Sequence, residues 1–237
     1  MKQLKIFTLL LLVAFSLSCS EESDDSSVIG DAIIVSKRSG TDVVYGVALY
    51  AYAYAYSPLK TVSAVSSLEL SNAVSLAANG SYTYNFIKEP TDSEYSGTIP
   101  VASIYTFNGV LESGATFECQ DILSSDALAP VTFEKCQYNT TDSYAEFSWI
   151  ALTNAYSYVI YIVNESGTVV FGSSMLSNTV TAGNISSSAS GWSSGYPIKG
   201  ATYTVRIYAF AYEDSLDVDS YQLQATSISE ATLVWGE

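Results

Sequence analysis

The sequence predicts an all-β protein made of two β-sandwiches in tandem, which follow an export signal and a short tether. Three observations predict it. Apolar residues make up 48% of the chain and tyrosine occurs 19 times, a composition that favours strands over helices. Short segments with alternating apolar and polar residues follow one another between turn signals. No segment shows a competing helical period.

The first 18 residues have the pattern of a secretory signal peptide. The first five carry two lysines, and residues 6–15 form an apolar run with a single threonine. This run is shorter than the roughly 20 residues of a membrane-spanning helix. Ser18 and Cys19 follow, and this stretch resembles the lipobox of bacterial lipoproteins. The resemblance implies cleavage before Cys19, acylation of that cysteine and attachment to a membrane through its acyl chains.

Residues 19–30 are predicted to form a flexible tether. Residues 20–27 contain only serine, glutamate and aspartate, and such a stretch cannot bury a core. An acidic run directly after the cysteine resembles the signal that sends Bacteroidota lipoproteins to the outer face of the outer membrane. This resemblance implies a surface-exposed, lipid-anchored protein of the outer membrane. The alternative is a plain solvated tether.

The charge and the missing residue types exclude several functions. The chain has a formal net charge of −15, and loss of Lys2 and Lys5 with the signal peptide leaves −17. So few basic residues provide no stripe for a phosphate backbone, so we expect no nucleic-acid partner. The chain contains no histidine, which removes histidine-based catalysis and most zinc and copper sites. We therefore expect no enzyme and no cofactor. The predicted domain boundary separates Cys119 from Cys136 in space, so we expect two unpaired, mostly buried thiols.

Residues 31–125 are predicted to form the first sandwich. Turn signals such as Asn79-Gly80 separate its strand-like segments. The predicted strands are residues 32–37, 43–56, 59–65, 73–77, 82–88, 105–110 and 115–123. About seven strands at this spacing are typical of an immunoglobulin-like β-sandwich.

The second of these strands carries four tyrosines at alternate positions: Tyr50, Tyr52, Tyr54 and Tyr56. Side chains of a strand alternate between its two faces, so the four rings share one face. One interpretation is a flat aromatic platform that binds a glycan or a partner's side chains. The other is that the tyrosines pack across strands, with each hydroxyl reaching water or a carbonyl.

Residues 130–237 are predicted to form the second sandwich. Trp149 ends a strand-like segment, and a later segment has an alternating motif after a glycine-containing turn: Tyr203, Val205, Ile207 and Ala209. These residues resemble fibronectin type III domains, which have a core tryptophan on the second strand and a Tyr-x-Val-x-Val-x-Ala strand. The resemblance implies that Trp149 meets this motif in the core. Tyr203 is placed for a hydrogen bond to upstream backbone.

The loop of residues 183–197 is a candidate ligand-binding loop. Its aromatic residues stand among serine and glycine, the composition of adaptable recognition loops. The sandwich topology places this loop at the end of the molecule away from the membrane. Trp192 and Tyr196 are therefore candidate ligand-binding residues. The alternative is that Trp192 folds back as a lid over the core.

The acidic loop of residues 213–219 is a candidate calcium site. Asp214, Asp217 and Asp219 could offer carboxylate oxygens to Ca²⁺. The alternative is a solvated loop of like charges.

Taken together, these features predict a non-catalytic cell-surface lipoprotein that acts in adhesion or partner binding through its distal loops. One alternative is a glycan-binding accessory protein of a nutrient-uptake system, with the tyrosine stripe or Trp192 as its platform. Another is a structural spacer or assembly subunit that binds no small ligand.

Overall fold

The computed structural model describes residues 28–54, 57–213 and 222–237. Cys19, Tyr56, Asp214, Asp217 and Asp219 therefore lie outside the described residues. Within them the chain forms fifteen strands, one short 3₁₀ helix and no α-helix, so the predicted all-β class is confirmed. No helix in these ranges has the length and hydropathy needed to cross a bilayer.

The first half of the chain contains seven strands, each at a place where the sequence predicts one. β1 begins at Val28, so it takes up the last three residues of the segment expected to be a tether. The elements are β1 (Val28–Ser39), β2 (Asp42–Ala53), β3 (Leu59–Ser66), β4 (Val74–Asn79), β5 (Tyr82–Lys88), the 3₁₀ helix η1 (Asp92–Glu94), β6 (Ser103–Leu111) and β7 (Thr116–Leu123).

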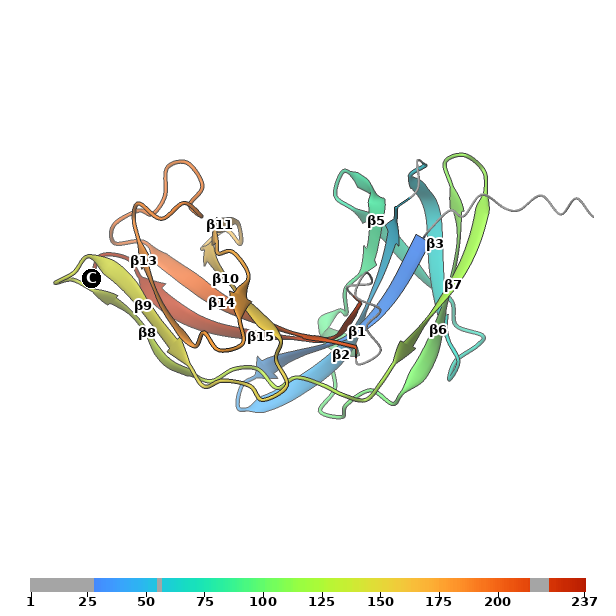
Figure 1. The fold of residues 1–237 in the computed structure, drawn as a ribbon, viewed down its shortest axis with the longest axis horizontal. Helices are drawn as coiled ribbons and strands as arrows, with labels where there is room; N and C mark the ends of the chain where they lie inside the picture. Colours follow the sequence, from blue (N-terminus) through green and yellow to red (C-terminus); the bar gives the residue numbers. More distant parts are fainter. Residues whose placement is uncertain (1–27, 55–56, 214–221) are drawn as a thin grey trace, which may run out of the picture.

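The second half contains eight strands. They are β8 (Phe133–Asn139), β9 (Tyr144–Trp149), β10 (Ser157–Asn164), β11 (Val169–Gly172), β12 (Leu176–Ser177), β13 (Ala182–Ser186), β14 (Thr202–Tyr212) and β15 (Leu223–Val234). A three-stranded sheet of β13, β9 and β8 covers one face of the strands β10, β14 and β15 (Figure 1). This half is a two-layer sandwich.

One hydrogen-bonded sheet runs through both halves, in the order β11-β10-β14-β15-β1-β2-β5-β4-β3-β6-β7. The two halves are joined in it by a parallel pairing of β1 with β15, from Ile34 opposite Ala225 to Lys37 opposite Ile228. In Figure 1 the two lobes meet at this pairing of β1 with β15. The N-terminal end of the sheet curls until β7 contacts β1, which closes it over an apolar core.

The core of the second half confirms the expected packing. Trp149 is 1% exposed, and its ring lies edge-on to Tyr158 with centroids 5.4 Å apart. The four residues of the predicted β14 motif are all buried: Tyr203, Val205, Ile207 and Ala209. The hydroxyl of Tyr203 accepts a hydrogen bond from the Ile198 N–H at 2.9 Å, which is the predicted bond to upstream backbone.

Candidate functional site

The predicted tip residues take part in closing one end of the second core. The Trp192 ring packs against Phe171 and Trp235, with centroids 4.9 and 5.0 Å away, and its indole N–H donates to a backbone carbonyl at 2.9 Å. The Tyr196 hydroxyl accepts from the Asn164 amide at 3.1 Å. Trp192 thus packs over the end of the core as a lid, which is the alternative to a ligand-binding position. The binding role of both residues stays a prediction.

The tyrosine stripe on β2 is divided between packing and exposure. The Tyr50 and Tyr52 rings are parallel with centroids 6.1 Å apart, and the Tyr50 hydroxyl donates to the Glu89 carboxylate. Burial raises the pKa of both hydroxyls, so both stay protonated. Tyr54 is 70% exposed. The ligand platform stays a prediction.

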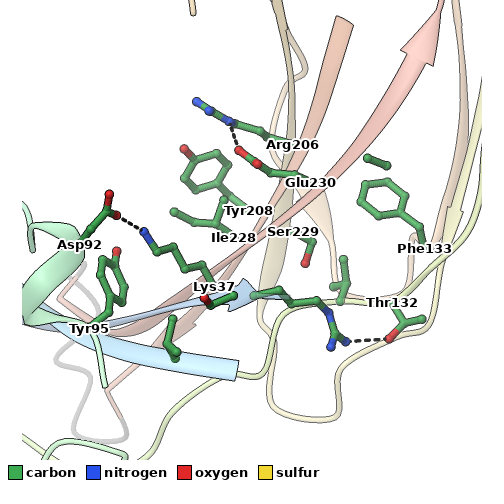
Figure 2. Close-up of a pocket in the computed structure, with 15 residues that line it drawn as sticks. Lys37, Asp92, Tyr95, Thr132, Phe133, Arg206, Tyr208, Ile228, Ser229 and Glu230 are labelled. Atoms are coloured by element: carbon green, nitrogen blue, oxygen red, sulfur yellow. Dashed lines mark hydrogen bonds and ion pairs between the residues drawn. The ribbon is translucent and has the colours of Figure 1, made fainter. Parts of the chain in front are cut away.

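A cavity of about 870 Å³ lies where the two halves meet (Figure 2). We call it the junction groove. One wall is the end of β1, with Lys37 and Arg38, together with Tyr95 after η1. The facing wall is the outer face of β14 and β15, with Arg206 and Tyr208. Both arginines of the chain therefore line this one cavity.

Two of the three cations in the groove are already paired. The Lys37 ammonium lies 2.8 Å from an Asp92 oxygen and 4.0 Å from the centre of the Tyr95 ring. The Arg206 Nε lies 2.7 Å from a Glu230 oxygen. Arg38 donates to the Thr132 hydroxyl at 3.3 Å and forms no ion pair within the described part of the chain. The Arg38 guanidinium therefore keeps donors for a ligand.

Two tyrosines offer neutral hydroxyls beside these cations. Burial raises the pKa of Tyr95 to about 12, with smaller contributions from Glu89 and Asp92. Burial also raises the pKa of Tyr208. The Tyr208 ring is held edge-on to Tyr161, with centroids 5.5 Å apart. Both hydroxyls can donate hydrogen bonds at neutral pH.

Three carboxyl groups meet at a second place between the halves. Asp31 on β1, Asp121 on β7 and Glu213 after β14 each offer an oxygen within 4.8 Å of the other two. We call them the carboxylate cluster. Burial raises the pKa of Asp31 to about 8 and that of Glu213 to about 7, and it raises the pKa of Asp121 as well. In the absence of a positive partner, these carboxyl groups hold protons more readily than ordinary acids.

No protein-family model matches the sequence, and no curated protein matches it. Among solved structures, a two-domain fibronectin type III segment of chicken tenascin is 14% identical, with a TM-score of 0.28, and the match covers 86% of this chain and 99% of that one. A bacterial ice-binding adhesin is 10% identical, with a TM-score of 0.29 and coverage of 88% and 65%. A DUF3823 family protein from Bacteroides uniformis is 9% identical, with a TM-score of 0.30 and coverage of 87% and 100%. At such low TM-scores, these likenesses define neither a family nor a function.

The sequence did not reveal the junction groove or the carboxylate cluster. The groove depends on two strand registers: β15 places Ile228 opposite Lys37 and Glu230 opposite Arg206. The one sequence signal was the rarity of arginine, which occurs only at positions 38 and 206. That signal becomes meaningful only after the strands are paired.

Proposed function

We propose that this chain is a non-catalytic binding module at the cell surface and that the junction groove is its ligand site. The ligand we infer is a short acidic oligosaccharide. One observation carries the proposal. Both arginines and Lys37 converge with the Tyr95 and Tyr208 rings in a single cavity, although the chain as a whole has a net charge of −15.

The chemistry of the groove suits a sugar acid. A guanidinium presents a planar fork that matches a carboxylate. Of the three cations that line the groove, Arg38 is the one that forms no ion pair with a described carboxylate. Tyrosine rings offer flat apolar surface and a polar hydroxyl. Asp92 and Glu230 are neutralised by their cations and retain oxygens that can accept from sugar hydroxyls.

Size and charge limit the ligand further. A volume of about 870 Å³ falls in the range of about 300–1,000 Å³ that is usual for small-ligand pockets. The strongly negative chain would repel a long polyanion at a distance. A short saccharide with its carboxylate at Arg38 avoids most of that repulsion.

The groove lacks the features of a catalytic site. The hydrogen bond from Lys37 lowers the pKa of Asp92, whereas a general acid at neutral pH needs a raised pKa. Elsewhere, burial raises the pKa of the Cys136 thiol to about 11, which disfavours the reactive thiolate. Both Cys119 and Cys136 are free and half-buried. These features support a binding role.

The proposal includes the location expected from the sequence. Acylation at Cys19 would hold the protein on the outer membrane with its body outside the cell, and the membrane would then be a partner through the lipid alone. Adhesion through the distal loops is the competing site for the same general role. We place the ligand in the groove because Trp192 and Tyr196 are occupied with packing and hydrogen bonding to their own core.

The test is an array of acidic and neutral oligosaccharides probed with the full chain, followed by calorimetry on each ligand found. Arg38→Gln should weaken binding of an acidic ligand by about 10- to 100-fold, because a charge-assisted hydrogen bond contributes about 1.5–3 kcal/mol. Lys60→Gln is the matched control, since Lys60 is an exposed cation on β3 and does not line the groove. It should bind as the wild type does.

Three results would contradict the proposal. The first is no binding to any acidic saccharide, which favours a structural spacer. The second is unchanged affinity in Arg38→Gln. The third is a loss of binding in Trp192→Phe with none in Arg38→Gln, which places the ligand at the distal loops.

A further inference from the structure

The carboxylate cluster is built from three segments that are far apart in the chain. Asp31 and Asp121 are only 3% and 4% exposed, and Glu213 is half-buried. None of the three takes part in an ion pair with any described residue. Three carboxylates this close repel one another strongly when they are ionised. The fold therefore gathers three carboxyl groups here without supplying a positive side chain.

Two buried carboxylate oxygens of the cluster have no hydrogen-bond partner among the described residues. Asp31 Oδ2 accepts the Leu223 N–H at 3.2 Å, but Asp31 Oδ1 is buried and has no hydrogen-bond partner among the described residues. Glu213 Oε1 is in the same condition. Asp121 Oδ2 accepts the Ala32 N–H at 2.7 Å, which fixes that carboxylate in place. A buried polar oxygen normally has a partner, because leaving it unpaired costs free energy.

We propose that the carboxylate cluster is a Ca²⁺ site. All of its donors are oxygens, and Ca²⁺ takes 6–8 oxygen ligands at about 2.3–2.6 Å. Oxygens bound to one Ca²⁺ can thus lie up to about 5 Å apart, which accommodates three carboxyl groups whose oxygens all lie within 4.8 Å of one another. Mg²⁺ demands near-ideal octahedral geometry at about 2.0–2.1 Å and usually keeps several waters, whereas Ca²⁺ tolerates irregular sets of carboxylates, so this cluster suits Ca²⁺ better.

A neighbouring cavity gives the ion access and room for water ligands. It has a volume of about 730 Å³ and is lined by Asp121 and Glu213 together with Gln222 and Gln224. It shares no lining residue with the junction groove. Water from this side can complete a coordination shell that the three carboxylates begin.

The position of the cluster gives the ion a structural role. β15 pairs with β1 only from Ile34 onward, and the part of β1 before Ile34 lies in contact with β7. The carboxylate cluster lies where the neighbour of β1 changes from β7 to β15. An ion bound to Asp31, Asp121 and Glu213 would tie β1, β7 and the end of β14 together, and so hold the first half of the chain against the second.

The test compares thermal unfolding of the full chain in excess Ca²⁺ and in a chelator. Because an ion that binds only the folded state stabilises it, the wild-type Tm should be higher in Ca²⁺. Tb³⁺ should bind the same site and show luminescence sensitised by tyrosine, since Tyr50 lies opposite Asp31 on the neighbouring strand. Added Ca²⁺ should displace it. Mg²⁺ should displace it less effectively.

Substitutions of the ligands separate binding from folding. Asp31→Asn should fold with an unchanged or higher Tm in chelator, because it removes a buried ionisable group from the cluster, and it should lose the Tm increase on Ca²⁺ addition. Glu213→Gln should weaken Ca²⁺ binding by about 10-fold or more. It should disturb the core less than Asp31→Asn does, because Glu213 is only half-buried. Glu118→Gln is the matched control: Glu118 is an exposed acid on the same strand as Asp121, three residues away and thus on the opposite face.

The proposal is overturned if the wild-type Tm is the same in Ca²⁺ and in chelator and Tb³⁺ gives no sensitised signal. It is equally overturned if Asp31→Asn and Glu213→Gln bind Ca²⁺ as the wild type does. Loss of binding in the triple variant Asp214→Asn, Asp217→Asn and Asp219→Asn, with retention in Asp31→Asn, would assign the ion to the acidic loop instead.

Discussion

At the scale of single residues, Gly30 shows how closely the first core is packed. A Cβ atom at Gly30 would lie 2.2 Å from the Phe107 ring, and Phe107 is fully buried. The ring therefore lies directly on the backbone of β1. This contact is one residue before Asp31, so the packing of β1 against the core also helps to hold the carboxylate cluster in position.

We predict that Gly30→Ala lowers the free energy of unfolding by about 1–3 kcal/mol, because the added methyl group overpacks the core. Gly97→Ala is the control, since its Cβ would meet nothing within 4 Å. It should be neutral or slightly stabilising, through reduced freedom of the unfolded chain. Urea denaturation of both variants measures the difference. Equal stability of the two would show that Phe107 can move away at little cost.

At the scale of elements, the short helix η1 positions one wall of the junction groove. The Glu94 carboxylate accepts from the Lys88 ammonium at 2.7 Å and from the Thr91 N–H at 2.6 Å, which closes the turn. The turn then carries Asp92 and Tyr95 toward Lys37. The same bonds, that from Lys88 foremost, lower the pKa of Glu94 to about 2.

This depressed pKa predicts an acid-sensitive contribution to stability. The folded-state pKa lies below the ordinary value of 4.5, so the stabilisation is present above about pH 5 and is lost as the pH falls toward 2. The Glu94 side chain is 49% exposed, so the contribution should be below about 1 kcal/mol. The Tm of wild type should exceed that of Glu94→Gln at neutral pH and approach it near pH 2. A Tm difference that is constant with pH would refute this account.

At the scale of the whole molecule, the two halves share both a sheet and a core. The parallel pairing of β1 with β15 links them through hydrogen bonds, and the buried apolar side chains of both halves form one contiguous cluster. Neither half can lose its joining strand without exposing part of the other. Each half therefore depends on the other for part of its sheet and part of its core.

We therefore predict one cooperative unfolding transition for the body of the protein. Calorimetric and van't Hoff enthalpies should agree. Trp149→Ala, which empties the centre of the second half, should lower the stability of the whole transition by about 3–5 kcal/mol. Two resolved transitions, of which Trp149→Ala moves only one, would show that the halves unfold independently.

Much of the local structure was predictable from the sequence. The strands of the first half were expected within a few residues, because side-chain alternation and turn residues are properties of neighbouring positions. The burial of Trp149 and the hydrogen bond of Tyr203 were expected from the fibronectin type III resemblance. The calcium prediction was made for Asp214, Asp217 and Asp219, which lie outside the described residues, and did not include Asp31, Asp121 or Glu213.

Composition and local patterns were enough to predict the all-β class and the strand positions of the first half, and the composition excluded histidine chemistry. Tertiary structure alone decided that β1 lies beside β15, which brings Arg38 to Arg206 in the groove and Asp31 to Glu213 in the cluster. The alternation of apolar and polar side chains that marks a strand is a property of neighbouring residues. Pairing between the two ends of a chain depends on how every intervening strand packs, and no single stretch of sequence carries that information.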